Sequence, residues 1–95
     1  MKIMISQPMN GKTEKQIKDE RKNLIKELEE EGHTVLETVF DDFDCYASPI
    51  AYLARSIEVL DKADAVVFMK GWENARGCII EHEIATKYNK FIKEL

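Results

Sequence analysis

The sequence has little cysteine, no excess of positive charge and no long apolar run. Its two cysteines, Cys45 and Cys78, match neither a metal-binding spacing nor a disulfide framework, so we expect a reducing, cytoplasmic setting. No apolar run approaches the length of a membrane-spanning helix. The apolar run in the opening MKIMISQPMN is also too short for a signal peptide. We therefore expect neither a membrane protein nor a disulfide-rich secreted one.

The charge balance restricts the class of partner. The chain has 14 Lys and Arg against 18 Asp and Glu, a formal net charge of −4. A nucleic acid polymer is not expected, because its phosphate backbone requires clustered Lys and Arg. A single nucleotide is compatible with this balance, since backbone N–H groups at the start of a helix can hold one phosphate.

The composition itself is that of a small globular protein. The 95 residues are 44% hydrophobic, which is enough for one core but leaves no room for a second domain. Repeats, low-complexity tracts and linkers are absent from the sequence. We predict a single domain over residues 1–95.

The first half of the chain predicts a strand, a helix and a second strand. KIMIS (Lys2–Ser6) is a short apolar run followed by the turn-rich QPMNGK, which is typical of a buried parallel strand and its loop. Thr13 and Gln16 form a capping box, so a helix should begin there, and Gly32 should end it. The β-branched His33–Phe40 should be the second strand. The apolar stripe of the helix is Ile17, Leu24, Ile25 and Leu28, and the charged residues between them should face solvent.

The second half predicts two further helices and up to two further strands. Ser48 and Pro49 mark a helix start, and an apolar residue then recurs every three or four positions at Ile50, Leu53, Ile57 and Leu60. Ala65–Met69 (AVVFM) is the clearest strand in the sequence. WENARGCIIEHEIA supplies the last helix, and NKFIKEL a short final strand.

Strands alternating with helices predict an α/β fold with a small parallel sheet of three to four strands and helices on both faces. Such a sheet binds ligands at the carboxyl ends of its strands. Those ends are residues 6–12, the loop after Phe40, and residues 70–76.

Two glutamates in the last helix have different expected positions. The helix turns by about 100° per residue, so the apolar arc that should face the sheet contains Glu81 but not Glu83. That arc is defined by Cys78, Ile80, Ile84, Ala85 and Tyr88. A carboxylate on this face must be hydrogen-bonded or lie at a cavity, because burying it unpaired costs several kcal/mol. Glu81 therefore either projects into the ligand crevice or pairs with a loop, Lys12 or Arg76, whereas Glu83 and His82 should be exposed.

At this point the sequence resembles a known family. Gly77, Glu81 and Ala85 in GCIIEHEIA match the motif G-T-x-x-E-x-G-x-A of the nucleoside 2-deoxyribosyltransferases and their deoxynucleotide N-glycosidase relatives. ISQPMNG (Ile5–Gly11) stands where that family has its nucleoside-binding loop, and KADAVVFM (Lys62–Met69) where its strand leads to the catalytic helix. The resemblance covers nearly the whole chain in the same order.

The resemblance implies a flavodoxin-like three-layer fold, a homo-oligomer with sites near subunit contacts, and Glu81 as the nucleophile. A carboxylate below the anomeric carbon can stabilise the oxocarbenium-like transition state of N-glycosidic cleavage or form a glycosyl ester. Neither a cofactor nor a metal is expected. The residues expected to contact a nucleoside or nucleotide, from the residues themselves and from the resemblance, are Ser6, Gln7, Pro8, Met9, Asn10, Gly11, Lys12, Trp72, Asn74, Arg76, Gly77 and Cys78.

Several of these candidates also have a structural interpretation. The SQPMNG segment is also compatible with a plain turn after the strand, and Lys12 and Arg76 with surface cations. Trp72 either stacks on a base or covers the sheet edge. Cys78 is expected to be a packed residue. Asp41, Asp42 and Asp44 lack the ligand spacing of a calcium loop and should form a solvated acidic loop.

Two functional hypotheses from different classes remain. The first is an enzyme that cleaves the N-glycosidic bond of a (deoxy)nucleoside or nucleotide, by hydrolysis or transfer, with Glu81 as nucleophile. The second is a non-catalytic binder that senses or sequesters a nucleotide or an ADP-ribose-like molecule. Ala75 favours the binder, since many members of the resembled family have an aspartate there, whereas the retained Glu81 favours the enzyme. The sequence also ends before the segment that completes the pocket in full transferases, which favours the binder too.

Overall fold

Four parallel strands form the centre of the fold, in the order β2-β1-β3-β4. The structure is a computed structural model that describes residues 1–39 and 48–95. Pairing in register joins Met4 to Leu36 and to Val66, and Val66 in turn to Ile92. The strands are β1 (Lys2–Ser6), β2 (Thr34–Leu36), β3 (Ala65–Phe68) and β4 (Phe91–Glu94).

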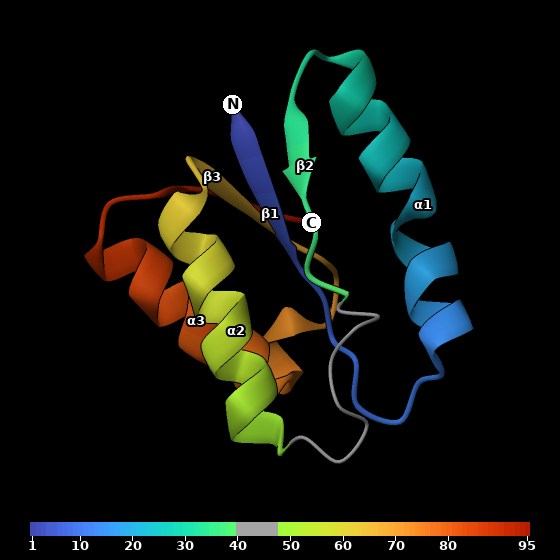
Figure 1. The fold of residues 1–95 in the computed structure, drawn as a ribbon, viewed down its shortest axis with the longest axis vertical. Helices are drawn as coiled ribbons and strands as arrows, with labels where there is room; N and C mark the ends of the chain where they lie inside the picture. The colour runs from blue at the N-terminus through green and yellow to red at the C-terminus, as the bar shows by residue number, and fades with distance from the viewer. Residues whose placement is uncertain (40–47) are drawn as a thin grey trace.

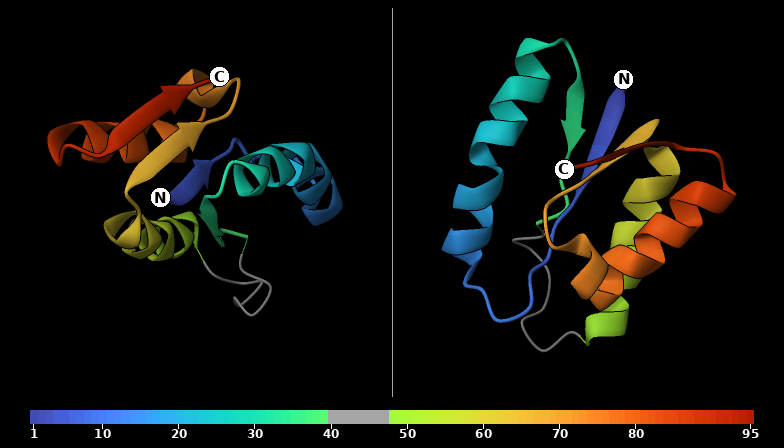
Figure 2. Two further views of the ribbon diagram at one scale, coloured as in Figure 1. Left: turned by 90° about the horizontal axis from the view of Figure 1, so that it is seen from above. Right: turned by 180° about the vertical axis from the view of Figure 1, so that it is seen from behind.

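The helices cover the two faces of this sheet. Helix α1 (Glu14–Glu30) lies on one face, and α2 (Pro49–Lys62) and α3 (Arg76–Lys87) lie side by side on the other (Figures 1 and 2). A single 3-10 turn, η1 (Trp72–Asn74), joins β3 to α3. The predicted α/β fold is confirmed: this is a three-layer arrangement consistent with a flavodoxin-like fold. Within the described ranges, no helix combines the length and the apolarity that a bilayer crossing requires.

Alternation along the strands divides the core into two layers. Successive side chains of a strand point to opposite faces, so Met4 and Val66 pack toward α2 and α3, while Ile3, Ile5 and Val67 pack toward α1. The predicted apolar stripe of α1 lies in the second layer, with Ile17 and Leu28 buried and Leu24 and Ile25 half-buried. The two layers hold β1 and β3 in the middle of the sheet.

Local signals in the sequence fix both predicted helix starts. The Thr13 hydroxyl accepts from the Gln16 N–H at 3.1 Å, and the Gln16 side chain accepts from the Thr13 N–H at 2.9 Å. Ser48 caps α2 by accepting from the Ala51 N–H at 3.1 Å, ahead of Pro49. The last predicted strand is also present, as β4.

The second strand is shorter than predicted. β2 ends at Leu36 rather than continuing to Phe40, which lies outside the described residues together with Asp41, Asp42, Asp44 and Cys45. After Leu36, hydrogen bonds made by side chains take the place of the backbone hydrogen bonds between strands. The Thr38 hydroxyl donates to the Ile5 carbonyl at 3.2 Å, and the Glu37 carboxylate accepts from the Val39 N–H at 2.7 Å. Hydrogen bonds between side chains and backbone thus take the place of strand pairing at residues 37–39.

The predicted inner faces of two helices are partly wrong. On α3 the buried residues are Cys78, Glu81 and Ala85, whereas Ile80 is exposed and Tyr88 is 73% exposed. On α2 the predicted Ile50 is exposed as well. Neighbouring elements set the rotation of α3: Gly77 faces Leu53 of α2, and the His82 ring packs on the other flank against Phe68 and Trp72.

We expect the Thr13→Ala variant to lower the free energy of unfolding by about 1 kcal/mol, because the Gln16 N–H at the start of α1 loses its side-chain acceptor. Urea denaturation followed by circular dichroism measures this difference. Lys15→Ala, at an exposed position in the same helical turn, is the matched control and should change stability little. Equal stability of the two variants would show that the cap contributes nothing to α1.

Candidate functional site

The carboxyl end of β1 brings two predicted site residues into contact. Ser6 is the last residue of β1, and its hydroxyl donates to Glu81 Oε1 at 3.2 Å across 75 positions of sequence. Both side chains are buried, with only 7% of Glu81 exposed. Glu81 is therefore on the sheet-facing side of α3, as predicted, and its partner is Ser6 rather than Lys12 or Arg76.

The connection between β3 and α3 directs Glu81 to this position. Gly71 has a φ of +92°, a left-handed conformation that favours glycine, and it reverses the chain after β3. The single turn η1 follows, and α3 begins at Arg76. Cys78 and Ala85 lie about one turn to either side of Glu81 on the same buried face. Their small side chains let the helix approach the sheet closely.

Burial controls the protonation of Glu81. Desolvation raises the pKa of this carboxyl group to about 7, while the Ser6 hydrogen bond and the positive charge of Arg21 oppose the shift. Near neutral pH the group is therefore divided between its protonated and ionised forms. Among the described residues it forms no ion pair, so its charge is held by one hydroxyl and by a more distant cation.

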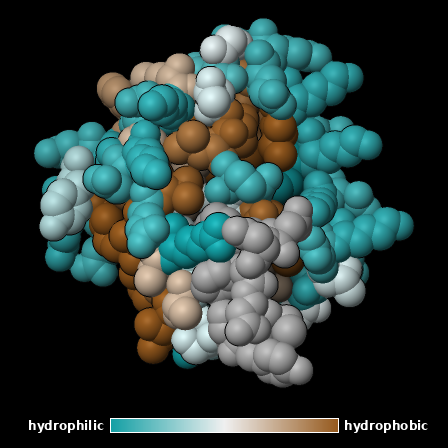
Figure 3. All heavy atoms as spheres, viewed as in Figure 1, coloured by the Kyte–Doolittle hydropathy of each residue, from teal (hydrophilic) through white to brown (hydrophobic). Residues whose placement is uncertain are grey.

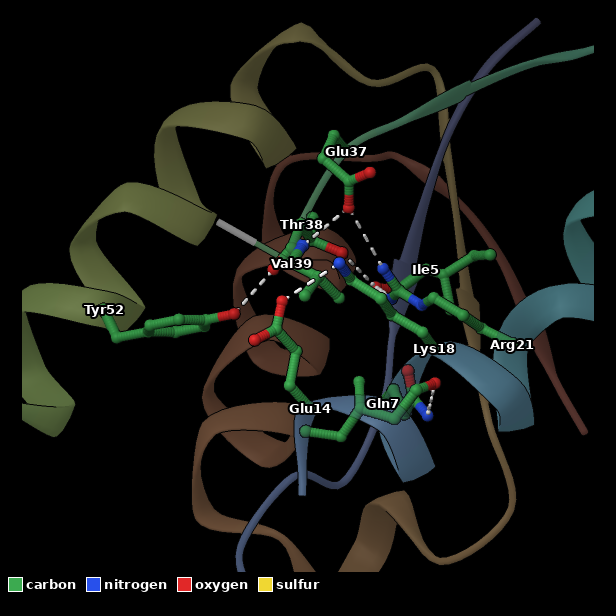
Figure 4. Close-up of polar contacts among 10 residues, drawn as sticks. Ile5, Gln7, Glu14, Lys18, Arg21, Glu37, Thr38, Val39 and Tyr52 are labelled. Carbon is green, nitrogen blue, oxygen red and sulfur yellow. Dashed lines mark hydrogen bonds and ion pairs between the residues drawn. The ribbon is translucent and has the colours of Figure 1, made fainter. Parts of the chain in front are cut away.

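A buried arginine lies beneath the same edge. Arg21 of α1 is only 2% exposed, and its Nη2 donates to the Ile5 carbonyl at 3.1 Å (Figure 4). Its Nη1 lies 3.6 Å from the Glu37 carboxylate, which is itself mostly exposed. Burial lowers the pKa of Arg21, and the Glu37 charge opposes this. The positive charge stays close enough to Glu81 to favour its ionised form.

Arg21 is not among the predicted site residues, because the sequence pattern of α1 places its charged residues in solvent. One signal in the sequence points to it: Arg21 falls four residues after Ile17 and seven before Leu28, inside the apolar stripe. Arginine is also the cation best suited to burial, because its guanidinium is planar and weakly hydrated.

Two further hydrogen bonds connect this edge to β2 and α2. The Ile5 carbonyl accepts from the Thr38 hydroxyl as well as from Arg21, and the Thr38 carbonyl accepts from the Tyr52 hydroxyl at 2.8 Å (Figure 4). The residues that precede and follow the segment 40–47 are thus anchored to the end of β1. Thr38 and Tyr52 were not predicted either.

The loop after β1 is only partly directed toward Glu81. Gln7 is buried, but its Nε2 donates to the Ile17 carbonyl at 3.0 Å, so it supports α1. Pro8 and Met9 are half-buried, and Asn10 and Gly11 are exposed. The ammonium of Lys12 pairs with Glu20 at 2.8 Å. Within residues 6–12, only Ser6 at the end of β1 forms a hydrogen bond with Glu81.

Next to η1, the position of His82 differs from the exposed position expected from the sequence. The His82 ring stacks on Trp72, with centroids 4.2 Å apart and planes 10° from parallel, and it also contacts Phe68. His82 is thus half-buried rather than exposed, and this contact favours the sheet-covering role of Trp72. Glu83 is exposed, as expected, and its carboxylate pairs with Lys87. Asn74, at the end of η1, and Arg76, the first residue of α3, are exposed.

Cys78 is a packed residue, in keeping with the sequence. Its side chain is buried, and desolvation raises the pKa of the thiol, with the Ser6 hydroxyl and the charge of Lys12 acting in the opposite direction. A thiol with a raised pKa is a poor nucleophile at neutral pH. In the part of the chain that the structure describes, no three His, Cys, Asp or Glu side chains cluster closely enough to hold a metal ion.

Two surface pockets formed by described residues lie on α1 and α3, and neither includes Glu81. One, of about 270 Å³, is lined by α1 and the end of β2, with Arg21 at its wall and Lys18, Lys22 and Glu37 around it. The other, of about 420 Å³, lies on the flank of α3 between Trp72 and Lys87. Glu81 lines neither pocket, and its carboxyl group is buried against Ser6 at the carboxyl end of β1.

The raised pKa of Glu81 has a consequence for stability. The folded state holds this proton up to about pH 7, whereas the unfolded chain releases it near 4.5. Stability should therefore fall as the pH rises from about 4.5 to about 7, by up to about 3 kcal/mol from this group. We expect the Glu81→Gln variant to lack this loss, so that the variant gains stability relative to the parent protein across that window.

Urea denaturation of both proteins at pH values between 5 and 8 measures the difference, and the other titrating groups cancel in it. Parallel pH profiles for the two proteins would show that Glu81 titrates normally.

Comparison with known proteins identifies the family of the chain. No curated protein and no solved structure matched it. A family model described as "Domain of unknown function (DUF4406)" matches residues 1–94, which include all the elements from β1 to β4. The chain, with its buried glutamate at the carboxyl edge of a small parallel sheet, therefore belongs to the DUF4406 family.

Proposed function

We propose that the protein binds a nucleoside or nucleotide at the carboxyl edge of its sheet and cleaves the N-glycosidic bond through Glu81. The observation that carries this proposal is the buried, hydrogen-bonded carboxyl group of Glu81 at the end of β1. The resemblance of GCIIEHEIA to the nucleoside 2-deoxyribosyltransferase motif supports the assignment of the reaction.

The chemistry requires the ionised form of Glu81. The carboxylate attacks the anomeric carbon, the bond from that carbon to the base breaks, and the base leaves with the bonding electrons and takes up a proton. Attack by water on the resulting glycosyl ester returns the free carboxylate and releases the sugar; attack by a second base gives transfer. A pKa of about 7 leaves a substantial ionised fraction near neutral pH.

Ser6 and Arg21 have supporting roles in this proposal. The Ser6 hydroxyl donates to one carboxylate oxygen and so orients the carboxyl group. Arg21 stays beneath the edge as a buried cation that favours ionisation without forming a close pair. A close ion pair would hold the carboxylate in the resting state and reduce its nucleophilicity, so the separation suits a nucleophile.

A non-catalytic binder is the second candidate, and two observations favour it. Ala75 supplies no acid to protonate the leaving base, and the neighbouring Glu73 and Asn74 are exposed on the surface. The protonated fraction of Glu81 could instead donate a hydrogen bond to a ligand that is never cleaved.

Base release distinguishes the two functions. We expect free base from at least one member of a panel of deoxynucleosides and deoxynucleoside 5′-monophosphates, with a rate that increases as the pH rises through about 7 and falls at least about a thousandfold in Glu81→Gln. Liquid chromatography of the products measures it. Glu83→Gln, which alters an exposed glutamate two positions away, is the matched control and should leave the rate unchanged.

The same panel of compounds also shows how the enzyme proposal would fail. If no base is released but a nucleotide raises the melting temperature saturably, the binder is correct. If neither effect occurs with any member of the panel, both proposals are wrong.

A further inference from the structure

The outer edge of β4 is open for pairing. The N–H groups of Phe91 and Leu95 donate to carbonyls of the β3 side, at Asp64 and Phe68. Backbone direction alternates along a strand, so the N–H and C=O groups of Ile92 and Glu94 point away from β3. No other described strand pairs with this edge. An unpaired strand edge is a template for a further strand unless the protein blocks it.

The side chains of β4 are complementary to themselves in one antiparallel register. If Ile92 lies opposite Ile92 of a second copy, Phe91 lies opposite its Lys93. The side chain of Lys90, the residue before β4, then lies opposite Glu94 of that copy. Antiparallel pairing of identical strands relates the two copies by a twofold axis, so each pair of different residues forms twice. A register shifted by one residue would instead place Lys93 opposite Lys93, and like charges directly opposite each other destabilise a strand pair.

Contacts within one copy of the chain show that Lys90 and Glu94 lie on the same face of the sheet. Lys90 donates to the Asp61 carbonyl at the end of α2, and the Glu94 carboxylate lies 3.4 Å from the ring of His82 on α3. Both side chains are therefore on the side of the sheet that α2 and α3 cover. On the opposite side, Phe91 is 66% exposed, and the alkyl chain of Lys93 from a second copy would cover it.

The flank of α3 beyond β4 fits the same partner. Ile79, His82 and Thr86 follow helical spacing along this flank and line the shallow pocket of about 420 Å³ together with Trp72. Ile79 is 45% exposed there. Other hydrophobic residues reach the surface on the side of the molecule where α2 lies (Figure 3). Glu94 touches His82, so the pocket adjoins the open edge of β4.

The distance between the α3 helices of two copies paired through β4 would also suit helix packing. Because α3 contacts both β3 and β4, the α3 helices of two copies joined through β4 would be about two strand spacings apart, roughly 10 Å. Packed helices are separated by about 8–10 Å. The open flank of one α3 would thus be covered by the other at an ordinary packing distance.

We propose that two copies of the chain associate through antiparallel pairing of their β4 strands, with the register centred on Ile92 and with the two α3 helices packed against each other. This inference is independent of the reaction at Glu81. The self-complementary pair of Lys90 and Glu94 and the apolar flank at Ile79 commit the surface to a second copy rather than to an unrelated protein.

A charge-swap experiment tests the register. Lys90→Glu and Glu94→Lys each place like charges opposite each other twice, so each should weaken dimerisation about tenfold or more. The double variant restores opposite charges and should return the dissociation constant to within about threefold of the parent value. An equimolar mixture of the two single variants should form a heterodimer. Sedimentation equilibrium over a range of protein concentrations measures all four.

Controls separate this interface from general charge effects. Glu27→Lys on α1 makes the same change of charge on the far face of the sheet and should leave dimerisation unchanged. Thermal unfolding of each variant shows whether it is folded. A monomer at all concentrations would overturn the proposal, and Lys90 and Lys93 would then be charges that prevent edge pairing. A dimer that both single variants leave intact would also overturn it.

Discussion

Burial of the Glu81 carboxyl group against the end of β1 is the constraint on which the site depends. The Ser6 hydroxyl is its one direct hydrogen-bond donor among the described residues. Desolvation of this group costs free energy whenever the carboxyl is ionised, and that cost is a large part of the stability that a domain of this size has. A position this costly is hard to account for by packing alone. An apolar residue at position 81 would fill the same space between Cys78 and Ala85 without the cost.

The second charge at this edge gives the arrangement its electrostatic character. Arg21 is buried below the same strand end, bonded to the Ile5 carbonyl rather than to Glu81. The two opposite charges influence each other without a close contact. Such a separated pair lets the protonation of the carboxyl respond to small changes in its surroundings. Entry of an apolar or charged ligand would change those surroundings.

The sequence predicts the elements well because their signals are local. The capping box at Thr13, the Ser48-Pro49 start and the apolar run of β3 each act within a few residues. The burial of Glu81 was also predicted, although the helical wheel placed Tyr88 on the inner face, where the structure does not. The rotation of α3 depends on its neighbours, and a wheel drawn from one helix contains no information about them.

The other parts of the site depend on contacts between distant positions. Arg21 bonds to a carbonyl 16 residues away, and Tyr52 to the backbone of Thr38 across 14 positions.

The most direct test of the central claim is titration of the glutamate side-chain carboxyls by carbon NMR. One resonance, absent in Glu81→Gln, should titrate near pH 7 and move to a higher pKa in Ser6→Ala, which removes the hydrogen bond. If every glutamate titrates below about pH 5, Glu81 is solvated and the account is wrong.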